Sequence, residues 1–326
     1  MLTETSDTIL HVKDLQVRVA TRHGIGQAVD GIGFELRAGE TLGIVGESGS
    51  GKSMTSLAIL GLHPQPAAQI VGGQILFRGE DILKKTPAEL RRYRGRHIAM
   101  ILQDPMTALN PVFSVGRQLY EPLRLHRKLS GRPLREQAIE LLRLLQIQSP
   151  ASRLSNYPHQ LSGGMRQRVV GAIALSCNPE ILIADEPTTA LDVTVQAHYL
   201  ALLNEIQKKT GTAILFITHD FGVVARMCDR VAVMYAGRIV ETAPARELFE
   251  QPAHPYTEAL LKSVPDLHKP ADRLPSIQGS PPSIYNRPPG CPFAPRCSYV
   301  MAKCREEYPP ETSLTESHTT NCWRYA

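Results

Sequence analysis

The alternation of apolar and polar residues predicts a small antiparallel sheet in the first part of the chain. Residues 9–19 and 27–36 alternate in this way, and the turn-forming residues 21–24 separate them. Residues 74–77, after the paired glycines at 72–73, are a further short strand candidate. We therefore expect antiparallel strands that precede the main core of the protein.

A second group of strands shows no alternation. Residues 41–45, 181–184 and 213–218 are short and apolar throughout, as expected of buried strands. Parallel sheets covered by helices on both faces bury their strands in this way. The pattern therefore favours an α/β fold.

Helical patterns account for much of the remaining chain. Residues 54–62 have a helical composition, and residues 87–148 are predicted to form a mostly helical insert. Residues 193–210 are predicted to form an amphipathic helix that Gly211 ends. We expect a helical subdomain at about residues 87–178 beside the α/β core.

The strand at residues 41–45 leads into a glycine-rich loop with the spacing G-x-x-x-x-G-K-S. Glycines let the backbone turn so that its N–H groups point inward, the lysine reaches the β- and γ-phosphates, and the serine hydroxyl binds Mg²⁺. A helix that begins near the lysine directs its positive dipole end towards the phosphates. The predicted phosphate loop consists of Gly46, Glu47, Ser48, Gly49, Ser50, Gly51, Lys52 and Ser53.

Reactive side chains follow the two later apolar runs. Asp185 and Glu186 come directly after residues 181–184, and a carboxylate at this end of a strand completes the Mg²⁺ shell in nucleotide-binding parallel sheets. We expect Asp185 to act through the metal and Glu186 to orient or deprotonate the attacking water. His219 follows residues 213–218 and is placed to meet a γ-phosphate, although a single histidine at a strand end is more often structural.

A second loop, at residues 161–165, has the features of an anion-binding helix start. Ser162, Gly163 and Gly164 offer a hydroxyl and bare N–H groups directly before a helical segment. One bound nucleotide needs one such cradle. We therefore expect this loop to serve a nucleotide that another subunit holds.

Length and charge exclude several classes of protein. At 326 residues and 36.0 kDa the chain can form a main domain with an appendage, and a net charge of +5 is typical of a solvated surface. Its apolar runs are too short to cross a bilayer, and its first seven residues do not resemble a secretory signal. We expect a cytosolic protein that can sit on a membrane partner.

Together these motifs resemble the full set of the ATP-binding cassette (ABC) ATPases, in the family's order and over roughly residues 9–248. The resemblance implies a P-loop NTPase with a RecA-like core, an antiparallel β subdomain and an α-helical subdomain. It also implies that Gln103 links Mg²⁺ and the attacking water to a membrane-domain contact. Asp192, in Ala190-Leu191-Asp192, would be the D-loop residue and His219 the switch histidine. The ligands of Mg²⁺ would be Ser53, Gln103 and Asp185.

The family resemblance further implies a head-to-tail dimer that holds two ATP molecules. Each ATP would lie between the phosphate loop of one subunit and the serine–diglycine loop of the other. Closure on ATP and reopening after hydrolysis would drive two membrane permease subunits between inward- and outward-facing states.

The sequence His254-Pro255-Tyr256-Thr257 is similar to the tail of the ATPases of bacterial oligopeptide, dipeptide and nickel importers. This branch implies a place on the cytoplasmic face of the bacterial inner membrane. It also implies a second ABC ATPase as partner, favouring a paralogue, and an extracytoplasmic substrate-binding protein that acts indirectly. Peptides are the expected cargo, and nickel and glutathione remain alternatives.

Many relatives stack an aromatic side chain on adenine, whereas Arg22 or His23 would have to substitute here.

The last part of the chain, residues 251–326, is predicted to be an irregular extension to an ATPase domain at residues 1–250. It is rich in proline and contains four of the six cysteines, with the spacing C-x5-C-x6-C-x17-C: Cys291, Cys297, Cys304 and Cys322. In a reducing compartment such a group favours metal over disulfides. The spacing is not that of most zinc sites, and similarity to the peptide-importer branch implies a [4Fe–4S] cluster. Zinc and free thiols remain open.

A soluble ABC ATPase that acts on nucleic acid or ribosomes is the alternative function. DNA-repair and chromosome relatives carry long coiled coils or zinc modules between the two glycine loops, and this chain shows no heptad array there. Translation factors of the family carry two cassettes, and this chain has one of each motif. The sequence therefore favours an importer subunit without a nucleic-acid partner.

Overall fold

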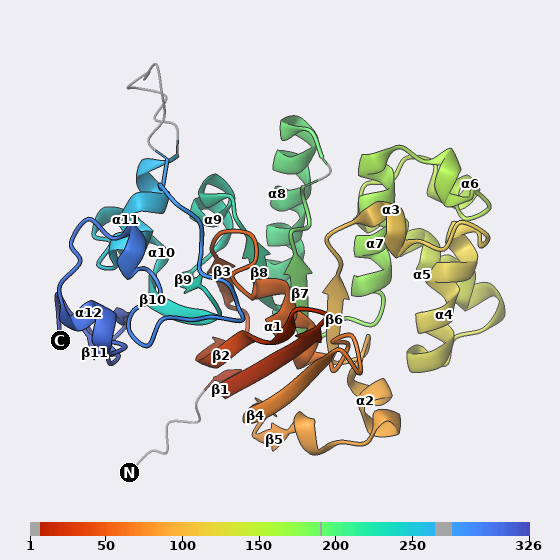
Figure 1. The fold of residues 1–326 in the computed structure, drawn as a ribbon. Helices are drawn as coiled ribbons and strands as arrows, with labels where there is room; N and C mark the ends of the chain where they lie inside the picture. The colour runs from red at the N-terminus through yellow and green to blue at the C-terminus, as the bar shows by residue number, and fades with distance from the viewer. Residues whose placement is uncertain (1–6, 190, 265–275) are drawn as a thin grey trace, which may run out of the picture. The chain divides into compact units, whose positions relative to one another are not determined.

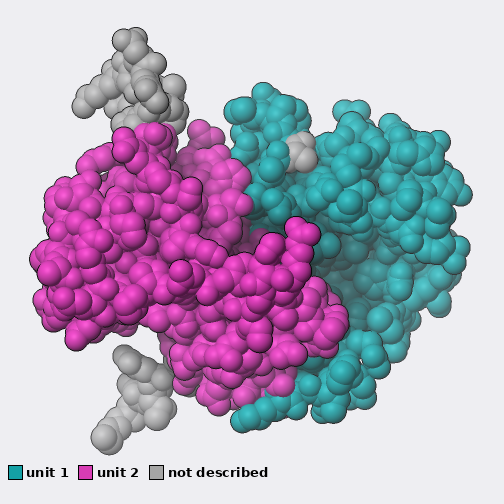
Figure 2. Space-filling model, in the orientation of Figure 1, with its two compact units in different colours: residues 1–7, 37–40, 84–216 teal, residues 8–36, 41–83, 217–326 magenta. Residues whose placement is uncertain are grey.

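The computed structural model describes residues 7–189, 191–264 and 276–326. The chain divides into two compact units, which Figure 2 shows in different colours. The first unit contains residues 1–7, 37–40 and 84–216, and the second contains residues 8–36, 41–83 and 217–326. Both units draw on segments that are far apart in the sequence.

The second unit contains the predicted antiparallel sheet. Its four strands run in the order β2-β1-β4-β5 (Figure 1). Their bounds are Thr8–Thr21 for β1, Gly24–Arg37 for β2, Ala68–Phe77 for β4 and Glu80–Asp81 for β5. The alternation at residues 9–19 and 27–36 therefore predicted two strands correctly. A bulge interrupts the β1–β4 pairing beside Gly73, where a Cβ would lie 2.4 Å from the carbonyl oxygen of Asp14.

The second unit also contains a second group of paired strands. Here the order is β11-β12-β10-β9-β3, with β3 and β9 parallel and the other pairs antiparallel. The strands are β3 (Thr41–Val45), β9 (Arg230–Tyr235), β10 (Arg238–Pro244), β11 (Thr312–Ser313) and β12 (Thr319–Thr320). The helices of this unit are α1 (Lys52–Ile59), α9 (Phe221–Met227), α10 (Ala245–Glu250), α11 (Pro255–Lys262) and α12 (Lys303–Glu306).

One apolar core joins the strands of the second unit to the last part of the chain. Val45 and Val233 from the central strands lie in the same buried cluster as Leu248 of α10, Tyr256 of α11 and Phe293. Cys291 and Cys297 pack against this cluster. The segment after residue 250 is therefore packed into the core of its unit. The predicted division at residue 250 stays a prediction.

The first unit contains strands β8, β7 and β6 in that order, with β6 and β7 parallel. These strands are β6 (Ile98–Ile101), β7 (Ile181–Asp185) and β8 (Ala213–Thr218). The insert at residues 87–148 is mostly helical, as predicted, and β6 is a strand within it. Its residues Ala99 and Met100 favour helices and lie within a charged segment of helical composition, and the pairing with β7 makes them a strand.

Helices make up most of the first unit. They are α2 (Pro87–Tyr93), α3 (Pro105–Ala108), α4 (Val115–Arg127), α5 (Gly131–Leu144), α6 (Pro150–Arg153), α7 (Gly163–Leu175) and α8 (Val193–Thr210). Gly211 ends α8 in the left-handed conformation, at φ 70°, as predicted. Among the described helices none is long and apolar enough to span a membrane.

Candidate functional site

The phosphate loop connects β3 to α1 and needs glycine at two of its positions. Gly46 has φ 155°, and a Cβ there would lie 2.1 Å from the carbonyl oxygen of Met234. Gly51 has φ 106°, and its Cβ would lie 2.6 Å from the carbonyl oxygen of Ala28. Any side chain at either position would displace backbone. The loop therefore has room for these glycines alone, as the sequence pattern implied.

Lys52 occupies the centre of this loop. It is the first residue of α1, is 4% exposed, and directs its ammonium group back into the loop. Its Nζ donates to the carbonyl oxygens of Gly46 at 2.8 Å and Glu47 at 2.9 Å, and to Ser50 Oγ at 3.3 Å. A buried cation beside the first N–H groups of a helix is the donor set that suits a phosphate. The loop thus fits the predicted triphosphate, and Ser53 follows Lys52 on the same helix.

The predicted carboxylates lie at the end of β7 in the first unit. Asp185 is the last residue of that strand and is 4% exposed. Glu186 follows with φ 44°, a conformation that side chains other than glycine seldom adopt. Its Oε2 accepts hydrogen bonds from Gln103 Nε2 at 3.1 Å and Thr189 Oγ1 at 3.0 Å. The fold therefore brings Gln103 and Glu186 together, and a strained backbone aims the carboxylate.

The serine–diglycine loop forms the start of α7. Ser162 is exposed and is the N-cap of this helix, accepting the N–H of Met165 at 3.3 Å. Gly164 lies against α8, where its Cβ would be 3.0 Å from Val195 Cγ1. Gly163 opens the helix. These residues lie at an open helix start, as the prediction of an anion-binding terminus requires.

Two further predicted residues lie at element ends. Asp192 is exposed and is the N-cap of α8, where its Oδ1 accepts the N–H of Val195 at 2.9 Å. His219 is exposed and follows β8. Ala190, which the resemblance placed in the D-loop, lies outside the described residues. The phosphate loop and His219 belong to the second unit, and Gln103, Ser162, Gly163, Gly164, Asp185, Glu186 and Asp192 belong to the first.

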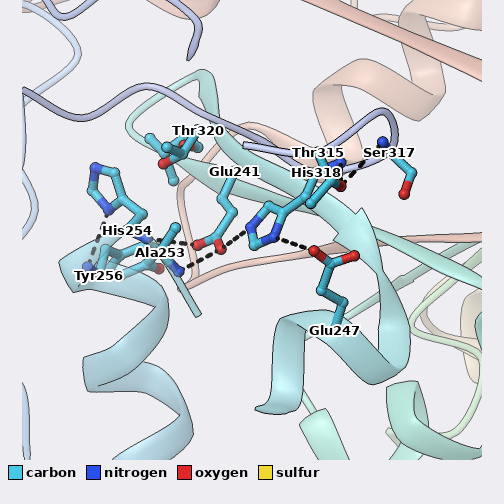
Figure 3. Close-up of polar contacts among 10 residues, drawn as sticks. Glu241, Glu247, Ala253, His254, Tyr256, Thr315, Ser317, His318 and Thr320 are labelled. Carbon is cyan, nitrogen blue, oxygen red and sulfur yellow. Dashed lines mark hydrogen bonds and ion pairs between the residues drawn. The ribbon is translucent and has the colours of Figure 1, made fainter. Parts of the chain in front are cut away.

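The His-Pro-Tyr motif begins α11 in the second unit. His254 is its N-cap, and the ring Nδ1 accepts the N–H of Tyr256 at 3.1 Å. The N–H groups of Ala253 and His254 donate to the buried carboxylate of Glu241 at 2.7 and 2.9 Å, as Figure 3 shows. Burial lowers the pKa of His254 to about 4. The ring is therefore neutral at pH 7, which leaves Nδ1 free of a proton to cap the helix.

Glu241 also holds the last strand of the sheet. His318, directly before β12, lies between Glu241 Oε1 at 2.8 Å from Nε2 and Glu247 Oε1 at 3.1 Å from Nδ1 (Figure 3). The hydrogen bonds to Glu241 and Glu247 raise the pKa of His318, even though its side chain is only 3% exposed. The ring, hydrogen-bonded to both carboxylates, thus fixes β12 beside β10.

The four clustered cysteines line one pocket. Cys291, Cys297, Cys304 and Cys322 surround a small cavity of about 20 Å³ together with His254, Phe293, Trp323 and Arg324. All four are free thiols, and Cys291 donates its N–H to the carbonyl oxygen of Cys304 at 2.8 Å. Burial raises the pKa of Cys291 to about 11. In the described parts of the chain, no three His, Cys, Asp or Glu side chains are arranged to hold a metal ion. The structure therefore supports the gathering of the thiols, but neither the predicted iron–sulfur cluster nor zinc.

The sequence analysis missed two residues that contact the phosphate loop. Arg296 forms an ion pair with Glu47, and the Tyr256 hydroxyl accepts the Glu47 N–H. Tyr256 lies in the His-Pro-Tyr motif, which identified the branch but gave no reason for the tyrosine. Arg296 carried no signal, because 249 residues separate it from its partner.

Comparisons with known proteins agree with this geometry. Residues 29–189 match the family model described as ABC transporter, and residues 240–304 match the one described as the oligopeptide/dipeptide transporter C-terminal region. The chain is 52% identical to the dipeptide transport ATP-binding protein DppD of Bacillus subtilis, over 97% of this chain and 95% of that protein. It is 48% identical to the oligopeptide transport ATP-binding protein OppD of Escherichia coli, over 98% and 94%.

Solved structures resemble the fold. The dimeric structure of MJ0796, a bacterial ABC transporter cassette, matches 73% of this chain and 99% of its own, with a TM-score of 0.66 and 27% identity. CbiO1 from Clostridium perfringens, part of the ABC transporter complex cbiONQ, matches 75% of this chain and 92% of its own, with a TM-score of 0.62 and 30% identity. The predicted α/β P-loop fold is therefore correct. The chain belongs to the ABC transporter ATP-binding proteins, in their oligopeptide and dipeptide branch.

Proposed function

We propose that this chain is the ATP-hydrolysing subunit of a membrane importer for di- or oligopeptides. Relatives with about half of their residues identical, over nearly their whole length, carry dipeptide and oligopeptide transport in their names. The observation that carries the proposal is the phosphate loop. Its Lys52 is buried, and its Gly46 and Gly51 leave no room for a side chain.

The roles follow from the chemistry of each residue. Lys52 would neutralise the β- and γ-phosphates of a bound triphosphate, and Ser53, Gln103 and Asp185 are the residues that would hold Mg²⁺. Glu186 receives the proton of the attacking water, and its hydrogen bond from Gln103 sets the carboxylate in place. His219 contacts the γ-phosphate. Mg²⁺, when bound, draws charge from the phosphates during transfer.

The proposed assembly has two ATPases and two membrane permease subunits. Ser162, Gly163, Gly164 and Asp192 of one ATPase complete the nucleotide site of the other, which we propose to be a paralogue. The complex lies on the cytoplasmic face of the inner membrane and receives cargo from an extracytoplasmic binding protein. Each half-site lacks part of its donors for the developing phosphoryl charge until the partner arrives. Isolated protein is therefore expected to hydrolyse ATP slowly.

Substitutions at two of these residues test the proposal. In the assembled complex, Glu186→Gln is expected to bind ATP normally and to reduce the rate of ATP hydrolysis by at least about 100-fold, because the water loses its base. Lys52→Ala is expected to weaken ATP binding itself. Phosphate release and binding of a fluorescent ATP analogue measure the two effects. Hydrolysis by Glu186→Gln at the wild-type rate would refute the assigned base.

Coexpression with candidate permease subunits tests the transport role. A complex that hydrolyses ATP faster when substrate-loaded binding protein is added supports the importer. An ATPase that instead responds to DNA or ribosomes, and binds no permease, would refute it. Uptake assays with dipeptides, longer peptides, nickel and glutathione identify the cargo.

We also propose that the base site prefers ATP over GTP. The predicted planar residues lie together in the β1–β2 turn, where Arg22 Nε donates to His23 Nε2 at 3.0 Å. Tyr285 lies beside them, with its hydroxyl 2.5 Å from Thr21 Oγ1 and its ring centroid 6.3 Å from that of His23. Planar groups on an exposed turn suit a stacked base. Competition by GTP as effective as that by ATP would contradict this preference.

We propose that the four-cysteine pocket holds a [4Fe–4S] cluster, with zinc as the alternative. Four thiols from one short segment around a single cavity supply the number and kind of ligands that such a cluster needs. Two measurements on anaerobically purified protein test the cluster: absorbance at about 400 nm, and equal molar amounts of bound iron and sulfide. Cys304→Ser should remove both, and Cys177→Ser, outside the pocket, should remove neither. Zinc in place of iron would contradict the cluster.

A further inference from the structure

The N–H, the carbonyl oxygen and the carboxylate of Glu47 in the phosphate loop each have a partner. Its N–H donates to the Tyr256 hydroxyl at 2.8 Å, and its carbonyl oxygen accepts Lys52 Nζ at 2.9 Å. Its carboxylate forms a two-pronged ion pair with Arg296, at 2.7 Å from Nη1 and 2.9 Å from Nη2. Two of these three partners come from the segment after residue 250.

Arg296 is fixed from several sides. Its side chain is 4% exposed, and its remaining N–H groups reach the carbonyl oxygens of Gln278 at 3.0 Å and Ile277 at 3.4 Å. Nη1 also donates to the Tyr235 hydroxyl at 3.2 Å. An arginine with this many partners has one conformation, so it holds the Glu47 carboxylate in one place.

Three packed aromatic rings support the two contacts. The ring centroids of Tyr235 and Tyr256 are 4.5 Å apart, and Phe293 lies 5.4 and 5.3 Å from them. The Arg296 guanidinium lies 5.7 Å from the Tyr235 ring centroid and 5.9 Å from that of Phe293. Tyr256 is fully buried. The phosphate loop is therefore braced by a rigid cluster and not by exposed side chains.

The charge of Glu47 makes this brace relevant to ligand binding. A carboxylate in a loop that binds a triphosphate repels the ligand unless a cation compensates it. Arg296 supplies that cation at hydrogen-bonding distance and leaves the charge of Lys52 available for the phosphates. Without Arg296, the Glu47 carboxylate would lose its ion-pair partner in the same loop in which Lys52 Nζ contacts the Glu47 carbonyl oxygen.

We propose that Arg296 and Tyr256 are positioning residues for nucleotide binding, which act on the phosphate loop through Glu47. The C-terminal extension would thereby set the affinity for ATP by neutralising one carboxylate and fixing one N–H group of the loop. This inference rests on the proposed ATP-binding function. It gives the tyrosine of the His-Pro-Tyr motif a physical role, because His254 caps the helix that carries Tyr256 to the loop.

A set of substitutions in the full-length chain tests the inference by titration with a fluorescent ATP analogue and Mg²⁺. Arg296→Met is expected to weaken binding about tenfold, because Glu47 loses its counter-charge. Glu47→Gln is expected to tighten binding about threefold, because the loop loses a negative charge that repels the phosphates while Arg296 keeps its positive charge. The double variant should regain most of the affinity lost in Arg296→Met. A purely packing role for Arg296 would not be rescued by removing the carboxylate.

Two further variants serve as controls. Arg287→Met removes another buried extension arginine, which pairs with Asp30 at 2.6 Å, and should leave ATP affinity within about twofold. Tyr256→Phe keeps the ring and leaves the Glu47 N–H without its acceptor, so it should weaken binding about threefold. It remains informative if Arg296→Met does not fold, which thermal melting will show.

The outcomes separate this inference from the proposed function. Wild-type protein that binds no ATP would overturn the proposed function and the inference with it. If wild-type protein binds ATP, and Arg296→Met and Tyr256→Phe bind it with the wild-type affinity, the inference alone would be overturned. So would a double variant that binds as weakly as Arg296→Met, or an equal loss in Arg287→Met.

Discussion

His254 shows how a single residue can be held in one protonation state by its surroundings. Its ring is buried, and its Nδ1 accepts the N–H of Tyr256, so a proton on Nδ1 would both remove the cap and place a charge in the core. The folded protein therefore binds a proton at His254 less readily than the unfolded chain does. A histidine at a helix start looks exchangeable in the sequence, and here it is not.

This histidine predicts a loss of stability in acid. The folded pKa of about 4 lies below the ordinary value of 6.5, so the unfolded chain gains a proton first as the pH falls. The contribution is complete above pH 6.5 and is lost between pH 6.5 and 4, by up to about 3 kcal/mol in the free energy of unfolding. Urea unfolding at several pH values measures it.

A variant isolates this effect from other acid-sensitive groups. His254→Asn keeps an N-cap acceptor and cannot take up a proton, so its stability should depend less on pH between 6.5 and 4. His198→Asn, at an exposed position on α8, should keep the wild-type dependence. Identical pH profiles for wild type and His254→Asn would show that His254 is not the responsible group.

At the scale of one element, α8 shows a structural role for a residue that the family resemblance assigned to the nucleotide. Asp192 caps α8 through its hydrogen bond from the Val195 N–H at 2.9 Å. The cap satisfies one N–H group that has no partner inside the helix. A substitution that reduces ATP hydrolysis at this position can therefore act through the helix as well as through the nucleotide.

Two substitutions separate these effects. Asp192→Ala is expected to lower the free energy of unfolding by about 1 kcal/mol, because the cap is lost. Asp192→Asn retains a capping oxygen and should stay within about 0.5 kcal/mol of wild type. Thermal unfolding of the isolated chain measures both. Equal stability of all three proteins would mean that the cap contributes nothing, and any effect on hydrolysis would then belong to the site.

Elements also show where sequence analysis succeeds. The strands β1 and β2 and the phosphate loop were predicted because their patterns are local, and each determines its own conformation within a few residues. Strand β6 was missed because Ala99 and Met100 favour helices and lie within a charged segment of helical composition, and β12 because two threonines become a strand only beside β10. Arg296 was missed because an ion pair to a distant loop leaves no trace in neighbouring residues.

At the scale of the whole molecule, the segment after residue 250 supplies part of the core of its unit. It contributes Tyr256 and Phe293 to the buried cluster that also contains Val233 and Leu248. It also supplies His318, which pairs with the fully buried carboxylate of Glu241. A charged group in the core that loses its partner destabilises a protein strongly, by about 3–5 kcal/mol.

A truncated chain therefore tests the predicted division at residue 250. A fragment of residues 1–250 is expected to aggregate or to unfold at a much lower temperature, because it exposes apolar surface and leaves Glu241 unpaired in the core. Size-exclusion chromatography and calorimetry measure this. A monodisperse fragment with a cooperative transition near that of the full chain would show instead that the extension is an independent appendage.

The position of His318 has a consequence for synthesis on the ribosome. Its partner Glu241 is translated 77 residues earlier, and the two side chains lie 2.8 Å apart in the folded protein. Until residue 318 has left the exit tunnel, the Glu241 carboxylate on β10 lacks the histidine partner that it has in the core of the finished protein. We therefore expect this edge of the sheet to reach its final pairing only after elongation has passed residue 320, because β12 itself consists of Thr319 and Thr320.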